Sequence, residues 1–325
     1  MTDRIVVIVV NYTTADLSIR AVESVLTRQH AGRHVEVHLV DNASPGGDAE
    51  TLRTAHAERG WGNAVTLWLE TENHGFGRGN NVVLTALNTA ADPPDKVLLL
   101  NPDAYLENEA IDILATALER TPQAAAAGAC VLRSDHTPVP AAFRFPGPLN
   151  EVVRLINLGF VTQWARKARL PLPPDHPAGP VDWVSGASVM FRFGALQEVD
   201  FFDPAYFLYY EEVDLMRRLT QAGWSVLYEP NARVLHDEGA ATGQFAAQTD
   251  RQRDPAYLYE SWAHYFTGAM GRFGALLLAV SMLFAAFLNM VHRGLRGRPP
   301  TFPRYFVGDQ WRYVIRPLLF VRGKP

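Results

Sequence analysis

Residues 5–41 read IVVIVVNYTTADLSIRAVESVLTRQHAGRHVEVHLVD, and this stretch decides the fold. It begins and ends with apolar runs rich in β-branched residues, 5–10 and 35–40. Between them, residues 16–29 repeat apolar side chains at the spacing of one helical face. β-Branched runs bounded by turn residues predict strands, and an apolar period near 3.6 predicts a helix. A strand, a helix and a second strand in this order predict a parallel pair joined by a crossover helix.

The same alternation continues along the first third of the chain. Strands are predicted over 64–69 and 96–100, and helices over 79–91 and 108–119, the second of which opens on Asn108 as a capping residue. We therefore predict an α/β fold, with a mixed, mostly parallel sheet and helices on both of its faces.

The following region is less regular. Residues 134–180 are rich in proline, and we expect loops there with one short helix around 149–169. Regular elements then return as strands over 182–193 and 225–228 and a helix over 211–222, with Gly223 as its C-cap.

Composition bounds the class of protein. The chain has 325 residues, of which 48% are hydrophobic and 20% charged, enough to bury a large core. We expect a globular domain over 1–255 and a helical, membrane-associating region over 256–325. The single cysteine, Cys130, excludes a disulfide framework and indicates a reducing, cytoplasmic setting. The run at 5–10 is short and lacks a small-residue cleavage site, so we expect a buried strand and no signal peptide.

Charge and hydropathy set the last part of the chain apart. From His292 onward it carries eight Lys or Arg and one acid, a net charge of +7, whereas the whole chain carries −4. Residues 273–291 contain no ionisable side chain and are long enough to cross a bilayer, although an interfacial helix, a shallow hairpin or a buried core helix are alternatives. Aromatic residues and arginines follow, as is typical at lipid headgroup depth. We expect a peripheral or monotopic protein on the inner face of the cell membrane, and no nucleic-acid partner.

Polar residues follow four successive predicted strands. They are Asn11, then Asp41 and Asn42, then Asn73 and Gly75, then Asn101 and Asp103. In open α/β sheets ligands bind outside the carboxyl ends of the strands. Each position taken alone is also an ordinary turn residue, but the four positions together favour one site.

Three further features suggest chemistry. Asp103 ends the motif NPD and can hold Mg²⁺ or Mn²⁺. These cations prefer oxygen ligands and neutralise the phosphates of a nucleotide. The alternative is that NPD only forms a strand-to-helix turn, for which these residue types are well suited. Glu211 and Glu212 open a helix behind an aromatic run, which would desolvate a carboxylate and make it a general base. Acidic residues are also favoured in any first helical turn. His236 is either a further metal ligand or an ordinary surface histidine.

The glycine-rich run HGFGRGNN, residues 74–81, is not a dinucleotide fingerprint. That fingerprint belongs in the first strand-to-helix turn, where this chain has NYTTAD, which argues against an NAD-type oxidoreductase. We expect a glycine-rich turn near a nucleotide, with Arg78 placed to meet a diphosphate.

Taken together, these motifs resemble the family-2 glycosyltransferases, specifically their rhamnosyltransferase-like branch. The matching segments, within residues 5–236 and in the expected order, are VVIVVNY, VDNAS, NHGFGRGNN, LLLNPDA, VDWVSGASVMFR and YFLYYEEVDLMRRLTQAGWSVLYEPNARVLH. The ordered set is specific, whereas NPD alone is weak. The resemblance implies a GT-A fold and an inverting, metal-dependent sugar transfer in cell-surface polysaccharide synthesis.

The resemblance also implies roles for single residues. Glu212 matches the catalytic base, and Asp103 matches the metal-binding aspartate, with His236 near the metal. The donor-binding residues would be Asn11, Tyr12, Asp41 (against a uracil or thymine ring), Asn73, Gly75, Arg78, Asn80, Asn101 and Asp103. The acceptor-binding residues would be Trp183, Gly186, Ala187 and Glu211.

Two positions depart from the family pattern. The usual E-D-x-D reads Glu211-Glu212-Val213-Asp214, so the base is a glutamate, one methylene longer and with nearly the same pKa. Asn101 stands where many relatives have Asp, which reduces the number of carboxylates at the metal.

The resemblance implies a donor carrying L-rhamnose on dTDP, with UDP-sugars as the alternative, and a saccharide or lipid-linked saccharide acceptor. A non-catalytic nucleotide-sugar-binding or scaffolding protein on the same fold is the alternative function, and Glu at position 212 is its only support.

Overall fold

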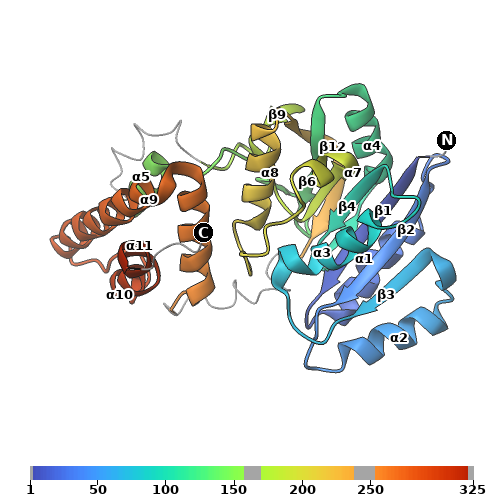
Figure 1. Ribbon diagram of the computed structural model, residues 1–325, viewed down its shortest axis with the longest axis horizontal. Coiled ribbons are helices and arrows are strands. Elements are labelled where there is room, and N and C mark those ends of the chain that lie inside the picture. Colours follow the sequence, from blue (N-terminus) through green and yellow to red (C-terminus); the bar gives the residue numbers. More distant parts are fainter. Residues whose placement is uncertain (1–2, 157–169, 238–252, 321–325) are drawn as a thin grey trace. The chain divides into compact units, whose positions relative to one another are not determined.

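The chain folds into two compact units, drawn in Figure 1 as a computed structural model that describes residues 3–156, 170–237 and 253–320. The first unit comprises Met1–Arg144, Pro171–Phe207 and Glu211–Gly243. The second unit comprises Phe145–Leu170, Leu208–Tyr210 and Gln244–Pro325.

The first unit is built on a mixed ten-stranded sheet. Its strands are β1 (Arg4–Asn11), β2 (His34–Asp41), β3 (Val65–Leu69), β4 (Lys96–Leu100), β5 (Ala104–Leu106), β6 (Ala124–Leu132), β7 (Pro138–Val139), β9 (Gly179–Val181), β11 (Ser188–Arg192) and β12 (Ser225–His236). The main order is β3-β2-β1-β4-β11-β6-β12-β5. β1 to β4 are mutually parallel, as are β6 and β12, whereas β11 runs antiparallel to β4 and β6. A separate antiparallel pair joins β8 (Ala142–Phe143) to β10 (Trp183–Val184).

Helices flank this sheet (Figure 1). They are α1 (Ala15–Leu26), α2 (Asp48–Glu58), α3 (Gly75–Asn88), α4 (Ala110–Arg120), α7 (Phe193–Glu198) and α8 (Glu211–Gln221). α1 and α3 pack against β1, and α4 packs against β6 and β12. The four predicted strands of the first third are confirmed as β1 to β4, and the predicted α/β class with a mixed, mostly parallel sheet is confirmed as well.

Two of the elements that were not predicted, β6 and α2, have a weak local pattern. β6 consists mainly of alanine, which carries little strand signal, yet every residue in it is buried at the centre of the sheet. Gly128 in β6 is required by packing, since a Cβ there would lie 2.5 Å from the side chain of Val184. α2 buries only Leu52 and Ala55, so its amphipathic pattern is faint.

Several predicted boundaries are wrong, each for a tertiary reason. Asn108 does not cap α4 with its side chain, because its amide donates to the carbonyl of Asn231 and its oxygen accepts from the N–H of Arg233. The strand predicted over 182–193 is divided between β10 and β11, which pair with different partners. The short strand predicted over 225–228 extends as β12 to His236 through an irregularity after Glu229.

The remaining elements begin or end close to their predicted positions, with two exceptions. α3 begins at Gly75, so the glycine-rich run forms the first turns of a helix and not the expected turn. The short helix expected around 149–169 is present as α5 (Pro148–Ile156), and residues 157–169 lie outside the described residues. Gly223 follows α8 with a φ of +96°, as expected for a C-cap.

The second unit is helical. Besides α5 it contains α9 (Ala256–Gly294), α10 (Phe306–Asp309), the π-helical segment η4 (Gln310–Ile315) and α11 (Arg316–Phe320). α9 packs against α5, η4, α10 and α11, and it is interrupted at Gly271, whose φ of 75° and ψ of 164° are not helical. By length and composition α9 is the one helix among the described residues that is apolar enough to cross a membrane.

Candidate active site

The site begins at the ends of β1 and β2. Their parallel register pairs Asn11 with Asp41, and the Asn11 amide donates to the Asp41 carboxylate at 2.8 Å and to the Asp48 carboxylate at 3.0 Å. The amide oxygen of Asn11 accepts from the hydroxyl of Ser18 at 2.8 Å. Asn11 is fully buried, so it holds these strand ends together, whereas its neighbour Tyr12 is 39% exposed.

Asn42, which sequence reasoning noted at a strand end without giving it a role, fixes the next loop. Its amide donates to the side chain of Asn73 at 3.1 Å and to the carbonyl of Gly75 at 2.9 Å. Its side-chain oxygen accepts from the N–H of His74 at 2.9 Å. Three hydrogen bonds to one buried residue couple the loop before α3 to the end of β2. The only signal in the sequence was its place next to Asp41.

Glycine is required where α3 begins. Gly75 has a φ of +72°, and a Cβ there would lie 1.8 Å from the carbonyl oxygen of Phe207. The N–H of Phe76 donates to that same oxygen at 3.2 Å. The first turn of α3 is therefore held against the segment that precedes α8 in the sequence.

The polar residues of α3 are partly engaged by their own helix. Asn80 is buried and donates to the carbonyl of Phe76 at 2.9 Å. The Nε of Arg78 donates to the carbonyl of His74 at 2.9 Å, and its guanidinium lies 6.0 Å from the ring centre of Phe207. The structure thus places both residues at the start of α3, beside the loop that Asn42 holds.

Asp103 and His236 are brought together by strand pairing. β12 runs antiparallel to β5 with His236 opposite Ala104, so the histidine stands beside the residue before Ala104. The Nε2 atom of His236 lies 3.0 Å from the Oδ1 atom of Asp103, whose side chain is buried. An imidazole nitrogen and a carboxylate oxygen facing each other fit a divalent cation such as Mn²⁺ or Mg²⁺, because both atom types are its ligands in proteins.

The three acids at the start of α8 have different surroundings. Asp214 is buried between Arg217, at 2.9 Å, and Arg218, at 2.7 Å, and is therefore structural. In contrast, the Oε2 atoms of Glu211 and Glu212 are buried without a hydrogen-bond partner among the described residues. Burial raises the pKa of Glu212. Burial raises the pKa of Glu211 well above its usual range, and the charge of its neighbour adds to this.

Both the NPD segment and α8 border the break between β10 and β11. The N–H of Asn101 donates to the carbonyl of Ala187 at 3.0 Å. A Cβ on the adjacent Gly186 would lie 3.9 Å from the Oε1 atom of Glu212 and 3.5 Å from the ring of Phe76. The segment at 185–187 therefore bonds to Asn101 and lies close to Glu212, which no local pattern in the sequence indicated.

Trp183, expected on the acceptor side, lies in β10 before this break. Its ring stacks on Phe143 with centroids 4.2 Å apart, and its Nε1 donates to the carbonyl of Arg144 at 2.9 Å. These contacts hold the indole and with it the strand that leads to Gly186.

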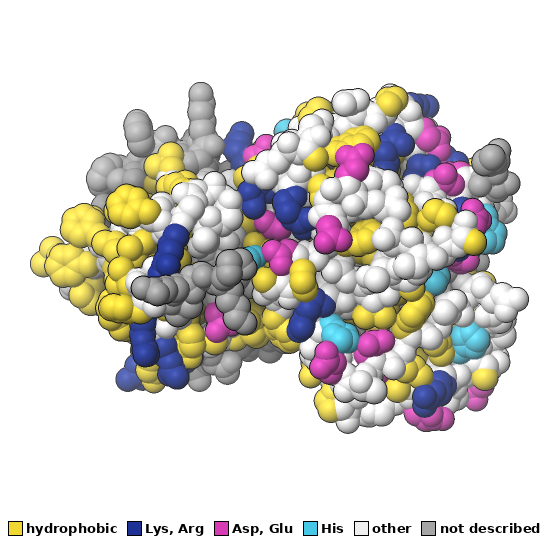
Figure 2. All heavy atoms as spheres, viewed as in Figure 1, with side chains coloured by type: hydrophobic (Ala, Val, Ile, Leu, Met, Phe, Trp, Pro, Cys, Tyr) yellow, Lys and Arg dark blue, Asp and Glu magenta, His cyan; other side chains and the backbone are white. Residues whose placement is uncertain are grey.

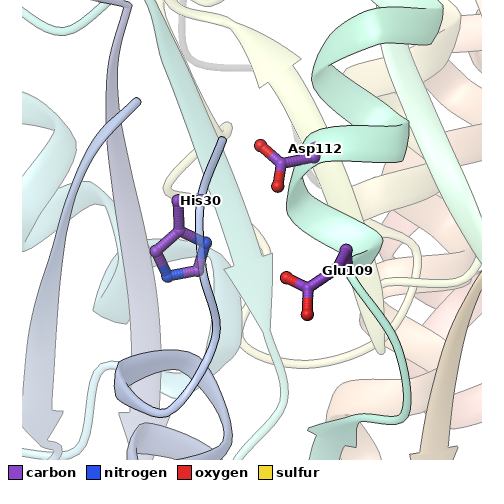
Figure 3. A group of neighbouring side chains, drawn as sticks. All are labelled: His30, Glu109 and Asp112. Carbon is purple, nitrogen blue, oxygen red and sulfur yellow. The ribbon is translucent and has the colours of Figure 1, made fainter. Parts of the chain in front are cut away.

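Figure 3 shows a second group of potential metal ligands, which the sequence did not suggest: His30, Glu109 and Asp112, whose ligand atoms lie within 4.8 Å of one another. Arg28 lies 3.7 Å from Glu109, and Arg33 lies 3.5 Å from Asp112. Because guanidinium groups already stand beside both carboxylates, this group is better described as an ion-pair cluster than as a cation site.

The fold and these residues define a class of protein: a glycosyltransferase of the GT-A type. Among solved structures, the chain superimposes on GalNAc-T7 (with UDP, GalNAc and Mn²⁺) with a TM-score of 0.55, at 12% identity, over 98% of this chain and 56% of that one. It superimposes on S. aureus TarS 1–349 with a TM-score of 0.52, at 15% identity, over 97% of this chain and 82% of that one. At such identities the likeness concerns the fold.

The chain belongs to the family described as glycosyltransferase like family 2, whose model matches residues 3–254. It is 32% identical to the N-acetylglucosaminyl-diphospho-decaprenol L-rhamnosyltransferase of Mycobacterium tuberculosis, over 79% of this chain and 80% of that protein. It is also 27% identical to the rhamnosyltransferase WbbL of Escherichia coli K12, over 50% of this chain and 61% of that protein. The protein is thus a glycosyltransferase, and the predicted family is confirmed.

Proposed function

We propose that this enzyme transfers L-rhamnose, with inversion at the anomeric carbon, from a dTDP- or UDP-linked donor to a saccharide carried on a lipid. The sugar and the lipid-linked acceptor are suggested by the similar mycobacterial enzyme, whose name gives both. The observation that carries the chemistry is the buried, unpaired carboxylate oxygen of Glu212 beside Gly186, with the Asp103–His236 pair in the same unit.

Glu212 supplies the base. In water a glutamate is too weak to take a proton from a hydroxyl, and burial raises its pKa toward the value that suits a general base near neutral pH. The acceptor hydroxyl loses its proton to Glu212 as its oxygen forms the new bond to the anomeric carbon. The bond from that carbon to the diphosphate oxygen breaks, and the nucleoside diphosphate leaves from the opposite face.

Asp103 and His236 are proposed to hold a divalent cation. When bound there, such a cation neutralises the negative charge of the diphosphate leaving group. Asn101 lies two residues before Asp103; its backbone N–H donates to the carbonyl of Ala187, and it would border the same phosphates. The uracil or thymine ring of the donor nucleotide is proposed to lie by Asp41 at the end of β2. The exposed ring of Tyr12 can cover the nucleobase there.

Acceptor binding is assigned to the segment from Trp183 to Ala187 and to Glu211. Glu211 is nearly inaccessible, at 3% exposure, and its raised pKa favours the protonated form, which can donate a hydrogen bond. Gly186 leaves room next to Glu212, since any side chain there would occupy the space in front of that carboxylate.

The role of Glu212 as general base is tested by measuring transfer of labelled sugar by the Glu212→Gln variant. We expect loss of transfer with unchanged binding of the nucleoside diphosphate, because the amide keeps the shape and cannot accept the proton. Glu198→Gln is the matched control, since among the described residues the Glu198 side chain bonds only to Trp224, and this variant should retain activity. Substantial transfer by Glu212→Gln removes it from this role. Hydrolysis of the donor by the wild type with metal excludes a purely binding protein.

Calorimetric titration with Mn²⁺ tests the metal assignment without relying on activity. Asp103→Ala should lose Mn²⁺ binding, whereas Asp112→Ala, in the ion-pair cluster of Figure 3, should keep it. The reverse result would move the cation to the His30 group.

We also propose that the second unit rests on the cytoplasmic face of an anionic membrane. α9 exposes one stripe of large apolar side chains at helical spacing, whereas its opposite side is buried. The stripe consists of Phe273, Leu277, Val280, Phe284, Phe287 and Met290, exposed by 72%, 52%, 51%, 63%, 54% and 47%. Figure 2 shows the hydrophobic side chains gathered over this end of the second unit, with basic side chains beside them. Half of α9 is therefore free for lipid while the other half belongs to the unit's core.

The basic side chains near this stripe indicate that the lipid headgroups are anionic. Exposed arginines at 296, 298, 304, 312 and 316 alternate with the exposed rings of Tyr305 and Trp311. Flotation with phosphatidylglycerol vesicles should recover the protein, and flotation with phosphatidylcholine vesicles should recover much less. Phe284→Glu should weaken recovery on both. Equal recovery of that variant would refute the role of the stripe.

A further inference from the structure

The second unit contains a cavity of about 380 Å³ between α5, α9 and the segment at 301–310. Every residue that lines it belongs to that unit. Most of the lining is apolar and includes the rings of Trp262 and Phe306, whereas Glu151 and Gln310 are polar. Cavities of this size, with aromatic walls and a few polar side chains, are typical of sites for small molecules. The proposed transfer reaction assigns no role to these side chains.

Glu151 keeps one carboxylate oxygen without a partner. The side chain is buried, and both of its hydrogen bonds end on the Oε2 atom, from the Nε1 of Trp262 at 3.2 Å and from the guanidinium of Arg154 at 3.1 Å. No hydrogen bond to the Oε1 atom comes from the described residues. Because a carboxylate accepts hydrogen bonds at both oxygens, Glu151 can still accept one from a ligand.

Gln310 is the second polar group with unused capacity. It begins the π-helical segment η4 and is 1% exposed. Among the described residues its amide nitrogen reaches only the Sδ atom of Met282, at 4.0 Å, and a thioether is a weak acceptor. Buried polar groups are nearly always hydrogen-bonded in native proteins, and π-helical turns are frequent at functional sites. The cavity therefore indicates a ligand with hydrogen-bonding groups.

The wall of the cavity is held in place by other buried polar residues. The amide of Asn289 donates to the hydroxyl of Thr301 at 3.0 Å, and its oxygen accepts from the N–H of Thr301 at 3.3 Å. Arg253 donates to the buried carboxylate of Asp309, which precedes Gln310, at 2.9 Å. These contacts form the cavity before any ligand arrives, which lowers the entropic cost of binding.

The charges on the lining distinguish between classes of ligand. Glu151 and Asp254 are acidic, and Arg154, the one basic residue among the described lining residues, already bonds to Glu151. A phosphate group would therefore meet a surplus of negative charge. A purely apolar chain, such as an isoprenoid, would leave the polar groups of Glu151 and Gln310 buried without partners.

A neutral sugar ring meets both requirements. Its hydroxyls donate to carboxylate and amide oxygens, and the C–H groups on one face of the ring pack against an aromatic side chain. We propose that the cavity of the second unit binds a neutral sugar ring, which donates to the Oε1 atom of Glu151, bonds to the amide of Gln310 and packs on Trp262. Two sources carry such a ring, the proposed saccharide acceptor and a glycolipid of the membrane. The first source rests on the proposed function, and the second does not.

Binding of the methyl glycosides of N-acetylglucosamine, glucose and rhamnose to the full chain, followed by saturation-transfer NMR, tests the site. Gln310→Met keeps the length of the side chain and removes its amide, so Kd should rise roughly tenfold, the effect of about one hydrogen bond. Gln197→Met is the matched control, because it removes an exposed amide in α7 of the first unit and should keep the wild-type Kd. No binding of any glycoside by the wild type, or an unchanged Kd in Gln310→Met, would overturn the proposal.

A second pair of variants locates the sugar. Leu258→Trp places a larger ring at a half-buried position of the lining and should abolish binding, with circular dichroism confirming the fold. Gly186→Ala narrows the acceptor segment of the first unit and should leave this binding unchanged. Binding that is lost in Gly186→Ala and kept in Leu258→Trp would overturn the proposal.

Two further measurements distinguish the sources. If the acceptor supplies the ring, KM for the acceptor should rise roughly tenfold in Gln310→Met while KM for the donor stays the same. If a glycolipid supplies it, flotation of Gln310→Met with vesicles containing monoglucosyl diacylglycerol should fall while flotation with phosphatidylglycerol vesicles stays the same. No change in either measurement would overturn the proposal. Transfer by Glu212→Gln would refute the assigned base alone, because that residue belongs to the other unit.

Discussion

Replacing Gly75 with alanine should destabilise the first unit by about 3 kcal/mol, and the structure supplies each part of that figure. Gly75 has a φ of +72°, and an L-residue in the left-handed region costs about 1–2 kcal/mol. The added Cβ would lie 1.8 Å from the carbonyl oxygen of Phe207, which is backbone and has no rotamer to move. Separating the two breaks the bond from the Phe76 N–H to that oxygen, worth about 1 kcal/mol.

Thermal unfolding followed by circular dichroism measures this loss. For a unit of this size each kcal/mol lowers Tm by about 2–4 °C, so we expect a decrease of about 6–12 °C. The matched control is Gly194→Ala in α7, where a Cβ meets nothing within 4 Å. Alanine is the better helix former, so the control Tm should be unchanged or slightly higher.

The same variant should also weaken donor binding, because the first turn of α3 would move away from the loop that Asn42 holds. KM for the donor is expected to rise in Gly75→Ala and to stay at the wild-type value in Gly194→Ala. A Gly75→Ala protein that melts within about 1 °C of the wild type would refute the reasoning, since the backbone cost alone corresponds to about 2–8 °C.

Three other outcomes are expected. Glu211→Gln should raise Tm at pH 8 and change Tm little at pH 4. Burial and the neighbouring charge of Glu212 raise the folded-state pKa of Glu211. The protonated side chain therefore contributes its full stability below the ordinary pKa of 4.5, and this contribution is lost as pH rises through the raised pKa. A wild-type Tm at both pH values would contradict this. Asn42→Ala should cost about 2–3 kcal/mol of unfolding free energy and weaken donor binding, because it removes three hydrogen bonds to the loop at 73–75; urea titration measures the first. Arg218→Met should cost about 3 kcal/mol by the same titration, because it leaves the buried Asp214 with one arginine, and a loss below about 1 kcal/mol would show that this pair is not needed.

Membrane association and catalysis are separable in these designs. The apolar stripe of α9 lies at 273–291 in the second unit, whereas Asp103, Glu212 and His236 all belong to the first unit. Phe284→Glu should therefore change vesicle binding without changing kcat on a water-soluble acceptor. Loss of both together would contradict this separation.

Much of the first unit could be predicted from local pattern. The strands β1 to β4 carry dense β-branched or leucine runs, and parallel pairing follows from the helices between them. The residues at their ends could be named for the same reason. β6 could not be predicted, because an alanine-rich strand is recognised only by the sheet that surrounds it.

The sequence by itself determined which residue types stand at the ends of the strands and at the start of α8, because periodicity and motif order are properties of the chain alone. Only the tertiary structure decided which of them meet. Asp103 and His236 are 133 positions apart and come within 3.0 Å through the register of β5 on β12. Glu212 and Asp214 share one motif, yet one keeps an unpaired oxygen and the other is held by two arginines. Burial and pairing arise from distant segments packing together, and a local pattern carries no record of that packing.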